Sequence, residues 1–158
     1  MKKIMILFIL LLCMGCSSTS RRDSKISKYF TFKEATDSAI ARKYGIKNTP
    51  NNSEYKNIVY TAQRMDEVRK ALRTRVYVTS WYRNKKLNKR VKGSGNSYHQ
   101  KGLAVDFKIN GNAKDIKRKL DRAKVSYDQL IFYPRQNRVH ISFKKSKRQE
   151  RKQYFIIR

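Results

Sequence analysis

The sequence predicts an α+β fold, with helices first along the chain and a mainly antiparallel sheet second. Apolar residues recur at helical spacing between Tyr55 and Leu72. The apolar segments after Arg75 are instead short, rich in β-branched and aromatic residues, and separated by turn residues. The chain has 158 residues, of which 39% are hydrophobic, so it is long and apolar enough for one domain with one core.

Two helices are expected before the first strand. Thr31 and Glu34 have the spacing of a capping box, which predicts a helix from Thr31 to about Tyr44 that ends at Gly45. The segment that begins at Tyr55 has apolar residues at intervals of three and four, which predicts a second helix with one buried face. The residues of this face are Ile58, Ala62, Met65, Val68, Ala71 and Leu72.

Short segments of high β propensity are expected to pair into the sheet. Asn112 follows a turn and can cap a further helix from Ala113 to about Ala123. Pro134–Asn137 separates two later segments and is expected to form a hairpin turn. The expected strands are 75–80, 103–109, 128–133, 138–143 and an edge strand at 154–157.

Residues 1–16 resemble a bacterial lipoprotein signal peptide. A basic start precedes the apolar run Ile4–Leu12, which is too short to span a bilayer, and a Gly-Cys pair follows at which Cys16 would be acylated. Cys13 stands where the lipoprotein pattern has Leu, so ordinary secretory cleavage or an uncleaved anchor stays open. Because Ser17 is similar to the residue found in lipoproteins sorted to an outer membrane, we expect an exported, periplasmic protein that is lipid-anchored there.

The rest of the chain divides into a tether and a domain. Residues 17–27 are rich in Ser, Arg and Lys, which predicts a polar, basic tether. Residues 28–158 are expected to fold as the domain, and the basic residues between 144 and 152 to form a C-terminal tail.

The charge of the chain points to an anionic partner. Lys and Arg number 39 and Asp and Glu number 11, which gives a net charge of +28. Such a charge favours nucleic acid, an anionic membrane surface or an anionic envelope polymer as partner. The export leader and the lack of a recognisable nucleic-acid-binding motif argue against nucleic acid.

The chain has only two histidines, and strand alternation relates them to one carboxylate. In the expected strands, Asp106 and His140 each lie on the face opposite an apolar row, so neighbouring strands would bring them together. His99 lies just before the first of these strands. Two imidazoles and a carboxylate suit a catalytic zinc with a fourth position for water. The alternative is two unrelated histidines, with Asp106 paired to a lysine.

A longer pattern around His99 resembles a known family. Ser97–Asp106 reads S-x-H-x-x-G-x-A-x-D and resembles the first zinc motif of the zinc D-Ala-D-Ala carboxypeptidase family, in its small phage and bacterial form. The resemblance covers about residues 28–145 and implies the hedgehog/DD-peptidase fold, in which N-terminal helices pack on the sheet that bears the zinc site. Other segments similar to the family's motifs are Phe30–Glu34, Ser80–Asn88, Tyr127–Ile131 and Val139–Ser142.

The resemblance implies a zinc metallopeptidase that acts on peptidoglycan. His99, Asp106 and His140 would bind Zn²⁺, and Arg83 would stabilise the oxyanion formed when a zinc-bound water attacks the substrate carbonyl. The bond would be an amide next to a D-amino acid in stem peptides or cross-links. Carboxypeptidase and endopeptidase action both stay open, as do a cellular and a phage role.

Two departures from the family pattern bear on catalysis. Trp81 replaces a Gly, and no acidic residue lies between Asp128 and His140, where many members have the Glu that acts as general base. Asp128 is therefore the candidate base. A purely structural role for this carboxylate is an equal alternative, and Tyr133 is a weaker substitute that would stabilise the intermediate. The competing hypotheses are a non-catalytic zinc domain that binds the cell wall and a basic nucleic-acid-binding protein.

Overall fold

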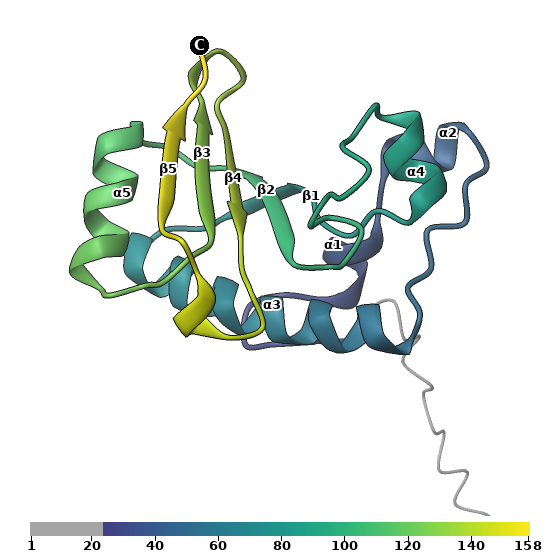
Figure 1. Cartoon of the computed structure of the whole chain (residues 1–158), viewed down its shortest axis with the longest axis horizontal. Coiled ribbons are helices and arrows are strands. Elements are labelled where there is room, and N and C mark those ends of the chain that lie inside the picture. Colours follow the sequence, from purple (N-terminus) through teal and green to yellow (C-terminus); the bar gives the residue numbers. More distant parts are fainter. Residues whose placement is uncertain (1–23) are drawn as a thin grey trace, which may run out of the picture.

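The structure, a computed structural model, describes residues 24–158 (Figure 1). The predicted signal peptide over 1–16, its lipid attachment at Cys16 and the first part of the tether lie outside the described residues. Within the described part, no helix combines the length and the apolar character needed to cross a membrane.

A five-stranded sheet in the order β1-β2-β4-β3-β5 forms the centre of the molecule. β1, β2, β4 and β3 pair antiparallel with their neighbours, whereas β5 pairs parallel with β3. The α+β prediction is confirmed, and the parallel edge strand makes the sheet mixed. The strands are β1 (Tyr77–Ser80), β2 (Ala104–Lys108), β3 (Gln129–Tyr133), β4 (Arg138–Ser142) and β5 (Gln153–Ile156).

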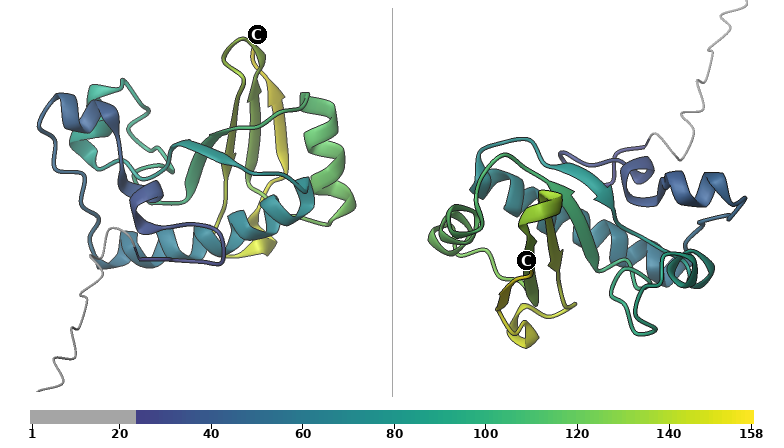
Figure 2. Two further views of the ribbon diagram at one scale, coloured as in Figure 1. Left: turned by 180° about the vertical axis from the view of Figure 1, so that it is seen from behind. Right: turned by 90° about the horizontal axis from the view of Figure 1, so that it is seen from above.

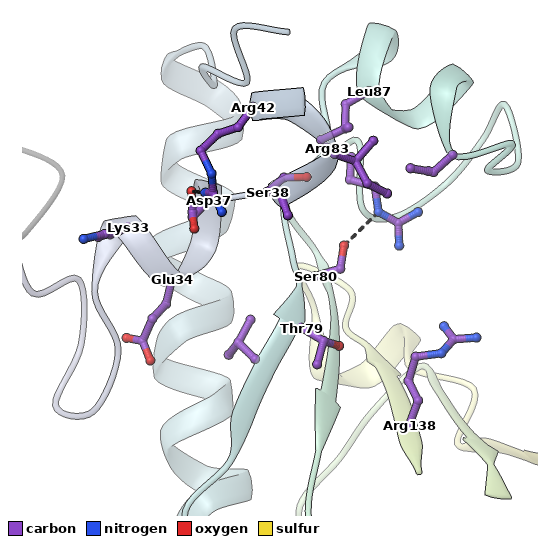
Figure 3. Close-up of a pocket in the computed structure, with 14 residues that line it drawn as sticks. Lys33, Glu34, Asp37, Ser38, Arg42, Thr79, Ser80, Arg83, Leu87 and Arg138 are labelled. Carbon is purple, nitrogen blue, oxygen red and sulfur yellow. Dashed lines mark hydrogen bonds and ion pairs between the residues drawn. The ribbon is translucent and has the colours of Figure 1, made fainter. Parts of the chain in front are cut away.

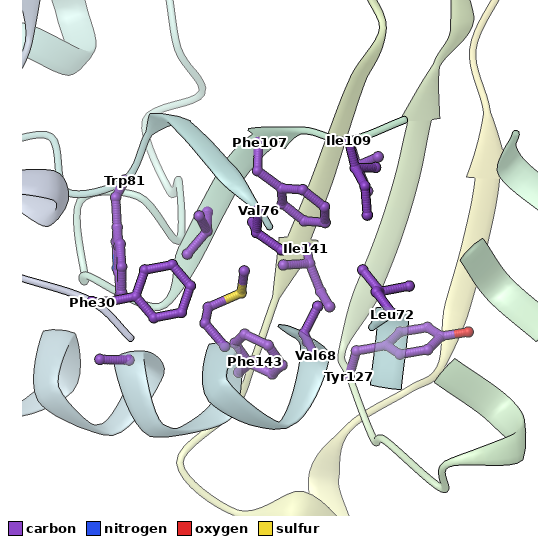
Figure 4. Close-up of a cluster of buried hydrophobic side chains, with 14 of the residues drawn as sticks. Phe30, Val68, Leu72, Val76, Trp81, Phe107, Ile109, Tyr127, Ile141 and Phe143 are labelled. Carbon is purple, nitrogen blue, oxygen red and sulfur yellow. The ribbon is translucent and has the colours of Figure 1, made fainter. Parts of the chain in front are cut away.

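Helices cover one face and both ends of the sheet (Figures 1 and 2). The long α3 (Asn52–Leu72) presents its predicted apolar stripe to the core, where it meets buried residues of β2 and β4 such as Phe107 and Ile141 (Figure 4). α5 (Ala113–Arg122), capped by Asn112 as predicted, lies at the β5 end. The β1 end carries the short helices α1 (Phe32–Thr36), α2 (Ala39–Lys43) and α4 (Lys85–Arg90).

The single helix predicted from Thr31 to Tyr44 is wrong, because the segment forms two helices. Thr31 and Glu34 do form the capping box that starts α1, but Asp37 ends that helix in an extended conformation. Ser38 is also extended, and its hydroxyl accepts the backbone N–H of Ala41 at 3.2 Å, which starts α2. A serine that caps a new helix competes with continuation of the old one.

The tether prediction extends too far into the domain. Ile26 is buried in the core, and Lys25 forms an isolated antiparallel bridge with Thr31. The Ser27 hydroxyl donates to Asp66 of α3 at 2.9 Å. Residues 24–27 therefore belong to the folded domain, since an apolar side chain followed by a short polar one can pack although the segment around them is basic.

The C-terminal basic segment is not a free tail. After β4 the chain forms a short 3₁₀ turn, η2 (Lys147–Gln149), and then adds β5 to the sheet beside β3. Two anchors fix this segment. Buried Glu150 forms an ion pair with Arg64 of α3 at 3.0 Å, and Arg151 binds Asp128 just before β3.

Candidate metal centre

The sheet register places two of the predicted ligands opposite each other. Asp106 of β2 pairs with His140 of β4, on the face away from the apolar core. His99 reaches the same point from the loop before β2. One ligand atom from each of the three residues lies within 4.8 Å of the other two. The structure thus brings together the three residues that the sequence analysis predicts as zinc ligands.

The loop between His99 and β2 depends on a glycine. Gly102 has φ +73°, a left-handed conformation that L side chains rarely adopt. A Cβ on this residue would lie 2.8 Å from Cγ1 of Ile58 and 3.1 Å from the carbonyl oxygen of Glu54. The indole N–H of buried Trp81 donates to the Gly102 carbonyl at 3.2 Å. Trp81, which replaces the glycine of the family pattern, therefore fixes the backbone of this loop by a hydrogen bond.

A backbone carbonyl sets the tautomer of His99. Nδ1 of His99 lies 2.6 Å from the carbonyl oxygen of Trp81, which can only accept, so Nδ1 bears the proton. In the neutral ring Nε2 is then an unprotonated acceptor, and it lies 3.4 Å from Oδ1 of Asp106. Burial lowers the pKa of His99, and the negative charge of Asp106 opposes that shift only in part. A neutral imidazole nitrogen thus faces a carboxylate oxygen.

Asp106 is held in its ionised form. Burial by itself raises the pKa of this carboxyl, but the hydrogen bond with His140 and the contact with His99 outweigh it and keep the pKa well below its usual range. Nδ1 of His140 lies 2.8 Å from Oδ1 of Asp106. Nε2 of His99 and Oδ1 of Asp106 are both acceptors, so they repel each other unless a proton or a cation lies between them. The site therefore fits a divalent metal, and nitrogen and carboxylate donors are the set that zinc prefers.

Arg83 contacts the carboxylate from the other side. Its Nη2 donates to Oδ2 of Asp106 at 3.1 Å, and its Nε donates to the Ser80 hydroxyl at 2.9 Å. Burial lowers the pKa of Arg83, while the charge of Asp106 opposes that shift. The structure therefore places Arg83 beside the ligand group, where the sequence analysis expects it.

A second arginine, Arg138, also contacts the site and was missed by the sequence analysis. Its Nη1 donates to Oδ2 of Asp106 at 3.3 Å. Its guanidinium stacks on the ring of Tyr133, 3.8 Å from the ring centroid. The signal that would have revealed it is strand alternation, because Arg138 lies two residues before His140 and so shares its face of the sheet.

Asp128, the predicted general base, is not part of this group. Its buried carboxylate accepts two hydrogen bonds from the side chain of Arg151, from Nε at 2.9 Å and from Nη2 at 2.6 Å, and a third from the Arg151 backbone N–H at 3.3 Å. The residue of β3 that pairs with His140 is Ile131, three positions farther along the chain. The contacts of Asp128 therefore match the structural alternative, with Arg151 as its partner.

No other described carboxylate replaces Asp128. Between residues 24 and 158, each acidic residue except Asp106 is engaged in a cap, a hydrogen bond or an ion pair away from the triad. These residues are Glu34, Asp37, Glu54, Asp66, Glu67, Asp115, Asp121, Asp128 and Glu150. Among residues 24–158, Asp106 is therefore the one carboxylate that belongs to the triad, and every other acidic side chain has a partner of its own.

A cavity of about 720 Å³ adjoins the metal group at Arg83 and Arg138. Figure 3 shows these two arginines together with Thr79 and Ser80 of β1 on one side of the cavity, and Lys33, Asp37 and Arg42 of the α1–α2 segment across from them. β1 is an edge strand, so the sheet ends at this cavity. The cavity lining does not include the three ligands themselves, and Arg83 and Arg138, which contact Asp106, connect it to the metal group.

A comparison with protein-family models gives a match to peptidase M15 over residues 28–142, which is most of the chain. No curated protein matches the chain. The matched range contains the three clustered ligands and both arginines. The chain therefore belongs to the peptidase M15 family, the zinc D-Ala-D-Ala carboxypeptidase family of zinc-dependent metallopeptidases.

Proposed function

We propose that this protein is a zinc-dependent peptidoglycan peptidase that hydrolyses an amide bond next to a D-amino acid in stem peptides or cross-links. The observation that supports it best is the convergence of His99, Asp106 and His140, with the unprotonated Nε2 of His99 facing Asp106. The family match supports the reaction class. The family resemblance also favours the hedgehog/DD-peptidase arrangement for the fold.

The residues of the chain hold the donors and the substrate. His99, Asp106 and His140 would bind the zinc, which when present supplies an activated water and polarises the scissile carbonyl. The Trp81 carbonyl fixes the ring of His99, and Arg83 fixes Oδ2 of Asp106. Nη1 of Arg83 has no hydrogen-bond partner among the described residues, so it can bind the oxygen on which negative charge develops.

One observation favours a second candidate function. Because the described residues offer no free carboxylate beside the triad, proton transfer has no dedicated side chain of the usual kind there. A zinc domain that binds the cell wall without cutting it would need no such base. Such a domain would bind the same metal and the same anionic polymer, but it would not hydrolyse the polymer.

We also propose an envelope location for the protein. The leader-like residues 1–16 support export and a lipid anchor at Cys16 in the outer membrane. The net charge of +28 would hold the domain against peptidoglycan and other anionic envelope polymers. In this proposal nucleic acid is not a partner, and a phage-encoded role is equally compatible with the sequence.

Mass spectrometry of peptidoglycan digests tests the proposal. Purified peptidoglycan is incubated with the protein, with added zinc or with a chelator. Zinc-dependent release of D-Ala indicates a carboxypeptidase, and loss of cross-linked muropeptides indicates an endopeptidase. Unchanged muropeptides from folded protein that contains one zinc would instead support the wall-binding domain. Tight, salt-sensitive nucleic-acid binding that survives zinc removal would contradict both.

A further inference from the structure

Two guanidinium groups share a single carboxylate oxygen at the metal group. Arg83 and Arg138 both donate to Oδ2 of Asp106, at 3.1 Å and 3.3 Å. We infer that Arg138, together with Arg83, forms a binding site for a free carboxylate on the leaving residue of the substrate. The inference rests on the proposed peptidase function and narrows it, because it assigns Arg138 as the residue that distinguishes a charged substrate end from a neutral one.

Each of the two arginines has donors to spare. Arg138 uses Nε for Oε1 of Gln136 at 2.9 Å and Nη1 for Asp106, and its Nη2 has no hydrogen-bond partner among the described residues. Arg83 uses Nε for Ser80 and Nη2 for Asp106, which leaves Nη1 without a partner among the described residues. Its two N–H groups suffice for the oxygen of the scissile carbonyl and for one oxygen of the carboxylate. Both residues line the cavity of about 720 Å³. A carboxylate in this cavity can therefore accept from both guanidinium groups without displacing Asp106.

The charges around the site favour an incoming anion. Two guanidinium groups face the one carboxylate of Asp106, so positive charge is in excess even before a metal adds to it. The acidic residues of the cavity wall, Glu34 and Asp37, do not correct this, because Lys33 and Arg42 line the same cavity and balance their charge. Charge-assisted hydrogen bonds to arginine are the strong kind, so a substrate carboxylate would gain from both the field and the contact.

Arg138 is held ready for this role. Its side chain is 27% exposed, and it stacks on Tyr133 across the β3–β4 pair. A planar guanidinium fixed by stacking and by two hydrogen bonds loses little further freedom when it binds a ligand. Tyr133, considered in the sequence analysis as a substitute for the missing base, is thus a support for Arg138.

The predicted substrate is consequently a peptide whose leaving D-residue has an ionised carboxylate. Amidation of that carboxylate removes the charge and turns one acceptor into a donor, which faces the guanidinium donors unfavourably. A matched pair of peptides, one that ends in D-Ala-D-Ala and the same peptide as its C-terminal amide, measures this preference directly.

The test combines hydrolysis with binding. The full-length zinc-loaded protein is assayed for kcat and KM on both peptides, and binding of both is measured by calorimetry after zinc removal, so that binding is read without turnover. We expect wild type to prefer the carboxylate peptide by at least about tenfold in both measurements. Arg138→Gln should lose this preference because it binds and hydrolyses the carboxylate peptide less well, while its values for the amide peptide stay unchanged. Arg138→Lys should retain part of the preference. Both variants should still contain one zinc per chain.

Arg135→Gln is the matched control, since this exposed neighbour loses the same charge outside the site. If Arg138→Gln weakens both peptides equally, or releases zinc while the preference persists, Arg138 only positions Asp106 and the inference is overturned. An absence of hydrolysis of either peptide by wild type would count against the proposed peptidase function. In that case the binding measurement still decides whether Arg138 distinguishes the carboxylate from the amide.

Discussion

His99 shows how one backbone hydrogen bond determines what a side chain can do. Because the Trp81 carbonyl accepts from Nδ1, the lone pair of Nε2 is directed toward Asp106. Burial lowers the pKa of His99 and so favours the neutral ring, which is the form that binds metal. Trp81 thereby orients His99 as a metal ligand, although the sequence marks Trp81 only as a departure from the family pattern.

The first prediction at this scale concerns His99→Ala. Loss of one of three ligands should weaken zinc binding by at least about a hundredfold, because even outer contacts of a metal site are worth ten- to a hundredfold. Competition with a chromophoric chelator measures the affinity. Asn96→Ala, an exposed residue of the same loop, is the control and should bind zinc like wild type. Equal zinc affinity of His99→Ala and wild type would exclude this site as the metal centre.

The second prediction concerns Gly102→Ala. This substitution should lower the free energy of unfolding by about 2 kcal/mol or more, because φ is left-handed at +73° and the added Cβ would lie 2.8 Å from Ile58. The change should also weaken zinc binding, since the residue links His99 to β2. Chemical denaturation measures the stability. Gly95→Ala is the matched control, because its Cβ would meet nothing within 4 Å, and a loss there equal to that at Gly102 would contradict the argument.

At the scale of elements, the sequence predicted which segments would form strands and where the long helix would lie. Period-two and period-3.6 patterns are local properties of the backbone, so β2, β4 and the stripe of α3 could be read directly. The break between α1 and α2 was missed because Ser38 has weak helix preference and equally serves as a cap. The docking of the C-terminal segment was missed because basic residues dominate it.

The third prediction, at this scale, concerns Asp128→Asn. The carboxylate joins the start of β3 to the segment before β5 through Arg151, so its loss should cost about 2 kcal/mol of stability. Zinc content and any peptide hydrolysis should remain close to wild type. Asp121→Asn removes an exposed pair with Lys117 and should cost less than about 0.5 kcal/mol. Loss of hydrolysis with stability unchanged would restore Asp128 as the base.

The same residue predicts a pH dependence. Burial raises the pKa of Asp128, but its hydrogen bonds from Arg151 outweigh that effect and hold the pKa below its usual value. The stabilisation is therefore complete above the unfolded-state pKa of about 3.9 and is lost as the pH falls through the lower folded-state value. The stability difference between wild type and Asp128→Asn should be constant from pH 5 to 7 and shrink below about pH 4. A difference that does not change with pH would contradict this assignment.

At the scale of the whole molecule, charge is the dominant property. A net charge of +28 on 158 residues implies self-repulsion that folding must overcome. Some cations are used within the fold, as in the Arg64–Glu150 and Arg151–Asp128 pairs, but most of the basic residues between 24 and 158 form no ion pair. An anionic polymer close to the domain would relieve this repulsion.

The fourth prediction follows from this repulsion. The Debye length is above about 10 Å at 0.05 M NaCl and well below it at 0.5 M, so added salt screens the repulsion between the cations. The melting temperature at pH 7 should therefore rise by about 3 °C, the shift that corresponds to roughly 1 kcal/mol in a domain of this size. Thermal unfolding followed by circular dichroism measures it. A melting temperature that falls with salt would show that the internal ion pairs outweigh the net repulsion.

The sequence by itself determined the α+β class, the main strands and the three residues that converge as candidate zinc ligands. Alternation put Asp106 and His140 on one face, but alternation alone left unrelated histidines open. The resemblance of Ser97–Asp106 to a zinc motif added His99 and made the set specific. Tertiary structure alone decided the partner of Asp128 and the place of Arg138 at Asp106. Alternation puts Arg138 on the same face as His140, but it does not name a partner. With 39 basic residues in the chain, which arginine meets which carboxylate depends on how distant segments pack.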